Sequence, residues 1–200
     1  MNITVFGGAQ PQPGDDNYRM AQKLGQLLGQ AGHTVMTGGY GGTMEAVSRG
    51  AAETGAHVIG VTCGEIENWK GVRPNPWVHE VRHFESLIDR LTELMNNCEA
   101  AIALPGGAGT LTEIALLWNR VIIKSIPALP ILLIGPAWKA AFENIIAAQG
   151  IYINESDKHL LSFVPTVETA FELISKMNRQ PSNSVEYPSI SRDSSSLSAA

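Results

Sequence analysis

Short, almost wholly apolar runs alternate along the chain with longer segments in which apolar residues recur every three or four positions. The short runs predict strands and the longer segments predict helices. Strands are predicted at residues 3–6, 33–37, 57–62, 77–82, 100–104, 130–134 and 160–164. Helices are predicted around residues 20–28 and at 44–54, 87–95, 111–124, 138–148 and 166–177. This alternation predicts an α/β fold with a parallel sheet and helices on both of its faces.

The composition predicts one domain followed by a polar tail. The chain has 200 residues, of which 44% are hydrophobic and 16% are charged, so residues 1–178 are expected to fold around one sizeable core. From about Arg179 onward Ser, Pro and Asn are frequent and apolar anchors are few. Residues 179–200 are therefore predicted to be a disordered, Ser-rich tail.

Charge and hydropathy narrow the expected partners and location. The formal net charge is −5, which argues against nucleic-acid and membrane-surface partners because both favour basic patches. No apolar run reaches the ~18 residues that a membrane span requires. The N-terminus leads directly into a strand pattern without the features of a signal peptide. We expect a cytoplasmic protein that binds neither nucleic acid nor membrane.

Candidate metal ligands are sparse. Cys63 and Cys98 do not form a CxxC pair, and two thiols alone cannot complete a four-cysteine site. His79 and His83 stand four residues apart, but the valines around them indicate a strand, and this context argues against a zinc pair. The sequence therefore predicts no metal site.

A glycine-rich segment, Pro105–Gly109, lies between the apolar run at 100–104 and the next predicted helix. Its glycines permit positive φ and let a ligand approach the backbone closely. Thr110 is predicted to be the N-cap of the helix, with Glu113 at the capping-box spacing. The free N–H groups and the dipole of such a helix start suit a phosphate. Thr110 and Glu113 alternatively only cap each other, but the preceding glycines favour an anion site.

A second glycine cluster, Gly38–Gly42, follows the second predicted strand and is interpreted as the same device. It matches neither the GxGxxG fingerprint with its ribose-binding acid nor the GxxxxGK[ST] phosphate loop, so NAD binding and ATP hydrolysis lose support. Tyr40 inside the cluster either stacks on a base or fills the turn, and both interpretations stay open. Gly7 and Gly8, after the first strand, form a third and weaker candidate.

The segments GGYGGTME (38–45) and PGGAGTLTE (105–113) together resemble the LOG ("Lonely guy") family, long mislabelled lysine decarboxylases. The resemblance runs from about residue 3 to residue 174, and the PGGxGTxxE motif is highly specific for this superfamily. It implies a Rossmann-like three-layer sandwich, a LOG-like nucleotide-binding domain over residues 1–178 and a homodimer. No lysine lies in a recognisable pyridoxal-phosphate motif, so the decarboxylase label finds no support.

The resemblance also implies an activity and roles for individual residues. Characterised members cleave the N-glycosidic bond of cytokinin riboside 5′-monophosphates or AMP, giving a free base and ribose 5-phosphate. Glu113 matches the catalytic glutamate, which would activate water and stabilise charge on the ribosyl ring. Arg90 matches the catalytic arginine, which would keep Glu113 ionised or bind substrate oxygens, and no cofactor is needed. The implied phosphate- and ribose-binding positions are Gly106, Gly107, Ala108, Gly109, Thr110, Gly39, Gly41, Gly42 and Thr43.

A small-molecule nucleotide is the expected partner, and two main functions stay open beside a minor third, a signalling or regulatory module that senses a nucleotide. The first function is a nucleoside 5′-monophosphate phosphoribohydrolase. The second is a non-catalytic nucleotide or molybdenum-cofactor carrier of the same superfamily. Glu45 stands where the family commonly has glycine, Leu91 where a lysine often follows the arginine, and Thr112 where a second acid often stands. These departures leave the phosphate loop and catalytic pair intact and put the bound base in question.

Overall fold

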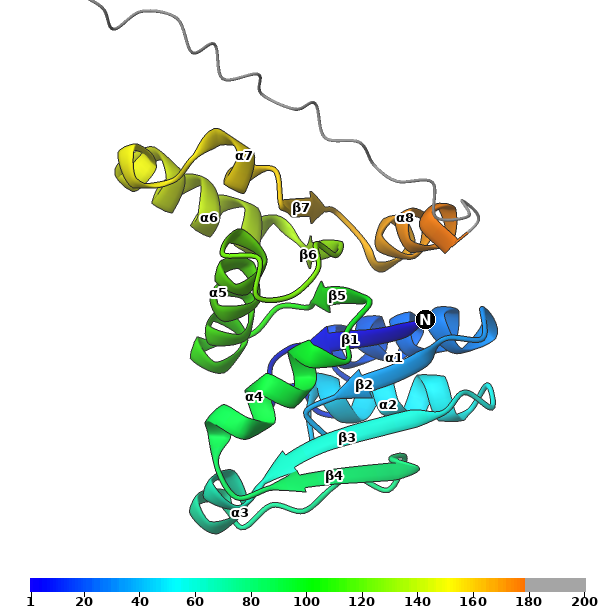
Figure 1. Ribbon diagram of the computed structural model, residues 1–200. Coiled ribbons are helices and arrows are strands. Elements are labelled where there is room, and N and C mark those ends of the chain that lie inside the picture. Colours follow the sequence, from blue (N-terminus) through cyan, green and yellow to red (C-terminus); the bar gives the residue numbers. More distant parts are fainter. Residues whose placement is uncertain (179–200) are drawn as a thin grey trace, which may run out of the picture.

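Seven parallel strands form one sheet at the centre of residues 1–178, the part of the chain that the computed structural model describes (Figure 1). The order across the sheet is β4-β3-β2-β1-β5-β6-β7, and every neighbouring pair is parallel. The expected parallel sheet is therefore confirmed. The strands are β1 (Asn2–Phe6), β2 (Thr34–Thr37), β3 (Val58–Cys63), β4 (Glu80–Phe84), β5 (Ala100–Ala103), β6 (Ile131–Ile134) and β7 (Leu161–Val164).

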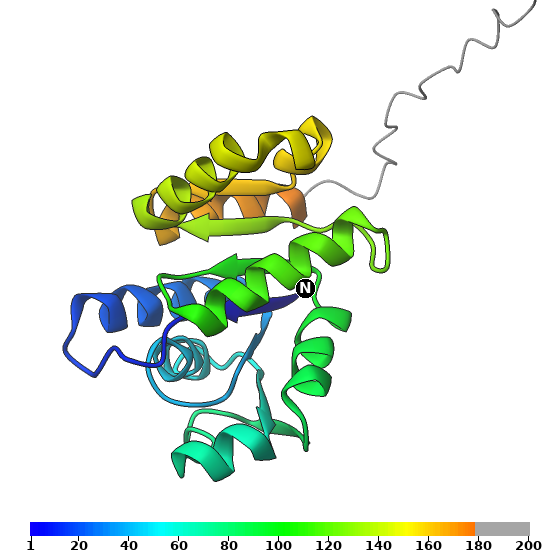
Figure 2. The same cartoon turned by 90° about the vertical axis from the view of Figure 1, so that its left-hand side faces the viewer.

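Helices cover both faces of this sheet, as predicted (Figure 2). One face is covered by α1, α2 and α8, and the other by α4, α5 and α6. The helices are α1 (Asp16–Gln30), α2 (Thr43–Ala52), α3 (Gly64–Lys70), α4 (Leu87–Asn96), α5 (Ala108–Ile122), α6 (Pro136–Gln149), α7 (Glu155–Lys158) and α8 (Val167–Asn178), with a 3₁₀ turn η1 at Gly150–Tyr152.

The strand side chains divide between two hydrophobic cores, because successive residues of a strand point to opposite faces. Ile3 and Ile102 pack into the core beneath α1, α2 and α8. Phe6 and Ala101 pack into the other core, beneath α4, α5 and α6. Both faces of the central strands are thus buried, which is why these strands appear in the sequence as continuous apolar runs.

The strand order reverses at β1, which lies between β2 and β5. In open parallel sheets the crevice at such a switch point, beyond the carboxyl ends of the strands, is the usual place for a ligand. Here the three loops that leave β1, β2 and β5 are tied together. The Gly8 N–H donates to the Pro105 carbonyl (3.1 Å), and the Thr43 N–H donates to the Gly8 carbonyl (2.9 Å).

The structure departs from the predicted elements mainly around residues 64–84. A seven-residue helix, α3, occupies part of a stretch expected to be irregular, and the fourth strand begins at Glu80 rather than at residue 77. The strand starts late because Asn75 organises a turn: its carbonyl accepts from the Val78 N–H and its side chain accepts from the Trp77 N–H. The turn η1 and the short helix α7 were also not predicted.

Two further expectations concern the C-terminal tail and membrane-spanning segments. The predicted disordered tail, residues 179–200, lies outside the described residues. Within residues 1–178, no helix combines the length and apolar character required to cross a membrane.

Candidate functional site

A cavity of about 460 Å³ opens at the switch point, beyond the carboxyl ends of β1, β2, β3 and β5. Its walls come from the loops after β1 and β2, from the start of α2, from α3 and the loop that follows it, from α4, and from the start of α5. Seven of the residues predicted for the site line this cavity: Arg90, Glu113, Gly41, Gly107, Ala108, Gly109 and Thr110. The other four, Gly39, Gly42, Thr43 and Gly106, are not among its lining residues.

Helix α5 begins at the floor of this cavity with Ala108, and Gly107 in an extended conformation is its N-cap. The Leu111 N–H is bonded to the Gly107 carbonyl, so the N–H groups of the three preceding residues have no acceptor within the helix. No side chain caps them, and the first turn carries no acidic residue. This helix start therefore presents free donors and the positive end of the dipole to the cavity, as an anion site requires.

The prediction that Thr110 is the N-cap of this helix is wrong. The helix begins two residues earlier, and Thr110 lies within its first turn with a buried side chain. The threonine packs against Gly106, where an added Cβ would stand 2.2 Å from the Thr110 Oγ1. Thr110 thus fills the space behind the loop, and the backbone donors that a capping hydroxyl would have occupied stay free for a ligand.

The Gly38–Gly42 loop is packed into the protein rather than laid open to the cavity. Gly39 has φ +78° and lies against Gly60 of β3. Gly42 has φ +74° and lies against the backbone of the loop after β1. The Thr43 hydroxyl is buried and donates to the Gly8 carbonyl at 3.0 Å. These positions hold the neighbouring loops in place, and only Gly41 of the predicted set faces the cavity from this side.

Arg90, on α4, is a buried cation with fixed partners. Its Nε donates to the Val61 carbonyl of β3 at 2.7 Å, and its Nη2 donates to the Gly38 carbonyl at 3.3 Å. Its guanidinium carbon lies 5.7 Å from the centre of the Tyr40 ring, a cation–π distance. The side chain is 4% exposed. The Val61 and Gly38 carbonyls and the Tyr40 ring therefore determine the position of the guanidinium charge.

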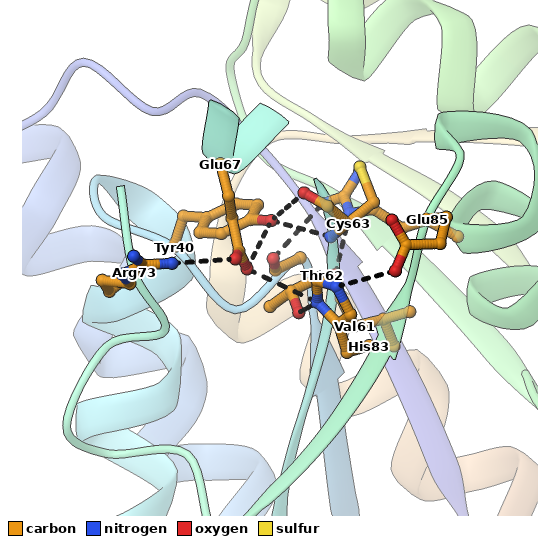
Figure 3. Close-up of polar contacts among 10 residues, drawn as sticks. Tyr40, Val61, Thr62, Cys63, Glu67, Arg73, His83 and Glu85 are labelled. Atoms are coloured by element: carbon orange, nitrogen blue, oxygen red, sulfur yellow. Dashed lines mark hydrogen bonds and ion pairs between the residues drawn. The ribbon is translucent and has the colours of Figure 1, made fainter. Parts of the chain in front are cut away.

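Tyr40 packs within the turn and also lines the cavity, so the role in stacking on a base that the sequence left open stays a prediction. Its ring is buried and its hydroxyl accepts a hydrogen bond from the Cys63 N–H at 2.8 Å (Figure 3). The same hydroxyl lies 3.2 Å from the Cys63 carbonyl and 3.4 Å from the Glu67 Oε1, two acceptors for its proton. Burial raises the pKa of the Tyr40 phenol, so it stays a neutral donor. Tyr40 thereby ties the loop after β2 to the end of β3, with Arg90 on its face.

Glu113, on the second turn of α5, faces Arg90 across the cavity floor. Its Oε1 lies 3.8 Å from the Arg90 Nη1, within ion-pair range but longer than a hydrogen bond. Burial raises the pKa of the Glu113 carboxyl to about 7, and the neighbouring Arg90 lowers it only in part. Arg90 favours the ionised form of Glu113, as expected, but desolvation by burial has the larger effect on this pKa.

Four cavity residues were not predicted from the sequence: Met44 of α2, Ile66 and Lys70 of α3, and Val72 just after α3. Helix α3 is too short for a hydrophobic period to identify it, and its neighbourhood of Trp, Pro and Gly predicts a loop. The loop after β1 also lines the cavity, through Gly7–Gln10. The glycine pair Gly7–Gly8 is the sequence signal for this loop, and it is the weakest of the three glycine clusters.

His79 and His83, the two histidines considered as a zinc pair, both contact residues of β3. The His79 Nδ1 accepts from the Val58 N–H at 3.1 Å, and the His83 Nδ1 lies 3.1 Å from the Thr62 Oγ1. Among residues 1–178, no three His, Cys, Asp or Glu side chains gather in a way that could hold a metal ion.

A comparison with known families bears on this geometry. Residues 1–130, which include both glycine loops, Arg90 and Glu113, match the SLOG cluster4 family. The chain belongs to this family.

Curated relatives of this SLOG protein include hydrolases. It is 36% identical over 132 residues to a rice protein named probable cytokinin riboside 5′-monophosphate phosphoribohydrolase LOGL5, over 62% of the chain and 51% of the rice protein. It is 28% identical over 141 residues to a pyrimidine/purine nucleotide 5′-monophosphate nucleosidase of Escherichia coli, over 66% of the chain and 31% of that enzyme. The chain thus spans about half or less of these two proteins, and the resemblance to the LOG family is confirmed.

Solved structures confirm the Rossmann-like fold. The SLOG chain superposes on a molybdenum cofactor binding protein from Rippkaea orientalis with a TM-score of 0.69 at 23% identity, over 88% of this chain and 96% of that one. It superposes on the molybdenum cofactor carrier protein of Chlamydomonas reinhardtii with a TM-score of 0.64 at 20% identity, over 90% and 98%. At these identities the likeness concerns the fold.

Proposed function

We propose that this SLOG protein hydrolyses the N-glycosidic bond of a nucleoside 5′-monophosphate and releases a free base and ribose 5-phosphate. One observation carries the proposal: a single helix, α5, presents free backbone donors at its start and a carboxyl of near-neutral pKa one turn later, both in one cavity. The relatives named phosphoribohydrolase and nucleosidase support the same reaction class.

The 5′-phosphate would bind at the start of α5. The free N–H groups of Ala108, Gly109 and Thr110 belong to residues that line the cavity, and the helix dipole adds to their attraction for an anion. Gly107 and Gly109 leave open space where a side chain would stand, so phosphate oxygens can reach the backbone. A phosphate anchored there places the ribose over the second turn of the helix, where Glu113 lies.

Glu113 would act on the bond between ribose and base. Glycosidic cleavage develops positive charge on the ribosyl ring, and an ionised carboxylate beside the ring stabilises this charge and deprotonates the attacking water. A pKa of about 7 suits that task, because the carboxylate is a stronger base than an ordinary glutamate and a large fraction of it is ionised at neutral pH.

Arg90 would supply the fixed positive charge of the pair. Its Nε and Nη2 are engaged by the Val61 and Gly38 carbonyls, so its role is to hold charge at one point rather than to follow the substrate. The Nη1 side faces Glu113. Arg90 favours the ionised form of Glu113 over the protonated form, so it raises the fraction of the carboxylate that can accept a proton from water in the resting enzyme.

The activity is tested by incubating the full chain with AMP, N6-prenylated AMP, IMP, UMP and CMP and measuring free base and ribose 5-phosphate by chromatography. Glu113→Gln is expected to lower the rate by roughly 10²- to 10⁴-fold, the range for loss of a general base. The log of kcat/KM should rise with pH and level off above an apparent pKa of about 7 in the wild type.

Glu143→Gln is the matched control, since Glu143 is exposed on α6 and lies outside the cavity lining. Arg90→Lys, which keeps the charge and loses the planar fork, is expected to slow the reaction as well, with thermal melting used to check the fold. Release of base that is equal in the Glu113→Gln variant and the wild type would remove Glu113 from the mechanism.

The molybdenum-cofactor carrier is the second candidate. It is favoured by coverage: this chain spans 96% and 98% of two solved molybdenum cofactor proteins, but about half or less of the named hydrolases cited above. The same cavity would then hold a phosphate-bearing cofactor without cleaving it. Tight binding of molybdenum cofactor, measured by transfer to an apo-enzyme, together with no base release from any nucleotide would support the carrier.

A further inference from the structure

We infer that the cavity prefers nucleotides whose base carries a ring carbonyl, such as hypoxanthine or uracil, over bases that carry an exocyclic amine at the same position, and that Lys70 reads this difference. The inference deepens the proposed function and rests on the same cavity, since it names the substrate class. It departs from the adenine substrates that the family resemblance implies.

The base end of the cavity lies on the α3 side. Helix α5 starts after β5, and α3 starts after β3, which is separated from β5 by β1 and β2. Three strand spacings amount to roughly 14 Å. A nucleotide whose phosphate lies on α5 and whose ribose lies over Glu113 therefore directs its base toward α3. The wall there is mainly apolar, with Ile66 and Val72 as lining residues.

Lys70 is the charged side chain that lines this end, and it is exposed to solvent. It is the last residue of α3, and Gly71, with φ +65°, ends the helix directly after it. Its ammonium lies 4.9 Å from the centre of the Trp69 ring. Within residues 1–178, no carboxylate lies within ion-pair distance of it. An ammonium has three donors and no acceptor, so it pairs with a carbonyl oxygen and not with an amine.

The carboxylates that could read an amine are turned away from the cavity. Glu67, one turn before Lys70, lies beside the Tyr40 hydroxyl and is bonded to Arg73 at 3.3 Å (Figure 3). Glu65 accepts from the Leu87 N–H at 2.7 Å. Neither lines the cavity. Helix α3 thus offers a donor at the base end and keeps its acceptors occupied elsewhere.

Tyr40 also lines the cavity, but its hydroxyl is engaged by Cys63 and lies 3.4 Å from the Glu67 Oε1. The remaining polar lining side chains belong to the phosphate and ribose end. Thr110 and Glu113 are on α5, Arg90 is anchored to backbone carbonyls beneath the ribose position, and Gln10 is on the loop after β1 at the switch point. Reading of the base by side-chain hydrogen bonds therefore falls to Lys70.

Two substrate pairs test the inference because each differs at one exocyclic position: IMP against AMP, and UMP against CMP. In the wild type, kcat/KM for the carbonyl member of each pair is expected to exceed that of the amine member by roughly ten- to hundred-fold, the discrimination of one charge-assisted hydrogen bond. Lys70→Met should remove the preference, and Lys70→Glu, which offers acceptors, should reverse it. Lys139→Glu, the same charge change outside the cavity lining on α6, is the matched control.

Calorimetric dissociation constants for the same four nucleotides separate the inference from the proposed hydrolysis. If no base is released but IMP and UMP bind more tightly and Lys70→Glu reverses the order, the inference stands and the hydrolase proposal fails. If hydrolysis occurs and AMP is preferred to IMP, or Lys70→Glu leaves the order unchanged, the inference is overturned and the hydrolase stands. If none of the four nucleotides binds, both are overturned.

Discussion

The Gly38–Gly42 loop and the Pro105–Gly109 loop have nearly the same composition and the same position after a buried parallel strand, yet they use glycine for opposite reasons. In the first loop a Cβ has no space at most glycines: at Gly38 it would meet the Arg90 Nη2 at 2.0 Å, and at Gly42 the Ala9 backbone at 2.5 Å, whereas Gly41 has room for one. In the second, Gly107 and Gly109 face open space.

The difference follows from what lies against each loop. The loop after β2 is pressed between the loop after β1 and the end of β3, so its glycines allow close packing. The loop after β5 leads directly into α5, whose first turn borders the cavity, so Gly107 and Gly109 leave the backbone accessible, while Gly106 packs against Thr110. Glycine clusters at strand ends are therefore evidence of close approach, but the approaching group is either the protein itself or a ligand.

The largest effect is expected from Gly42→Ala, which tests whether the glycines of the Gly38–Gly42 loop are required for packing. This variant should lose stability. The methyl group would clash with the Ala9 backbone and would also require a residue other than glycine to hold φ +74°. Together the clash and the strain predict a loss of about 3–5 kcal/mol in the free energy of unfolding, measured by denaturant titration. Gly55→Ala is the control, because Gly55 has φ +83° with nothing near it and should lose about 1 kcal/mol. Equal losses at the two positions would mean that packing does not constrain the loop.

A smaller change in stability is expected at Glu113. This residue lies on α5, which follows the Pro105–Gly109 loop, and it faces Arg90, which is bonded to the Gly38–Gly42 loop. The folded-state pKa of about 7 lies above the ordinary value of 4.5, so the folded protein binds more protons than the unfolded chain between these values. Stability from this group is fully present below about pH 4.5 and is lost as the pH rises through 7. Glu113→Gln should therefore be more stable than the wild type by about 3 kcal/mol at pH 8 and nearly equal near pH 4.5.

Denaturation midpoints at pH 4.5 and pH 8 measure this difference, and the exposed Glu143→Gln variant serves as the control. A stability gain of the same size at both pH values would show that proton binding at Glu113 is not its source.

The smallest expected change in stability is that of Gly109→Ala, which would sharpen the comparison. Gly109 lies in the first turn of α5 with nothing near an added Cβ, so alanine should stabilise the helix by about 0.5 kcal/mol. The methyl group would at the same time stand in the cavity and raise the Kd for ribose 5-phosphate. Calorimetry and denaturant titration measure the two effects in one protein. A destabilised variant, or an unchanged Kd, would contradict the ligand-facing role of this loop.

Much of the fold was predictable because the strands are buried on both faces and the helices between them are long enough to show a period. The run at β5 and the amphipathic pattern of α4 identified both elements close to their observed limits. Helix α3 was missed because seven residues show no period, and the start of β4 was misplaced because the Asn75 turn depends on a side-chain bond that propensity does not reveal.

The site was predictable where a local motif exists, and much less so where it depends on contacts between distant segments. The PGGAGTLTE segment identified the start of α5, but its capping residue was misassigned because Thr110 packs against Gly106. Arg90 was found through family register alone, since its partners on β3 and in the loop after β2 are far away in sequence. The pKa of Glu113 depends on burial, which only the folded chain defines.

The fixed position of Arg90 has a thermodynamic consequence for ligand binding. An arginine that became ordered only on contact with its ligand would lose about 1.5–2 kcal/mol of rotamer entropy at that step. Here the Val61 and Gly38 carbonyls immobilise the side chain when the chain folds. The entropy is therefore lost during folding and not during association, so a variant that frees this guanidinium should show a less favourable binding entropy even if its contacts with the ligand are unchanged.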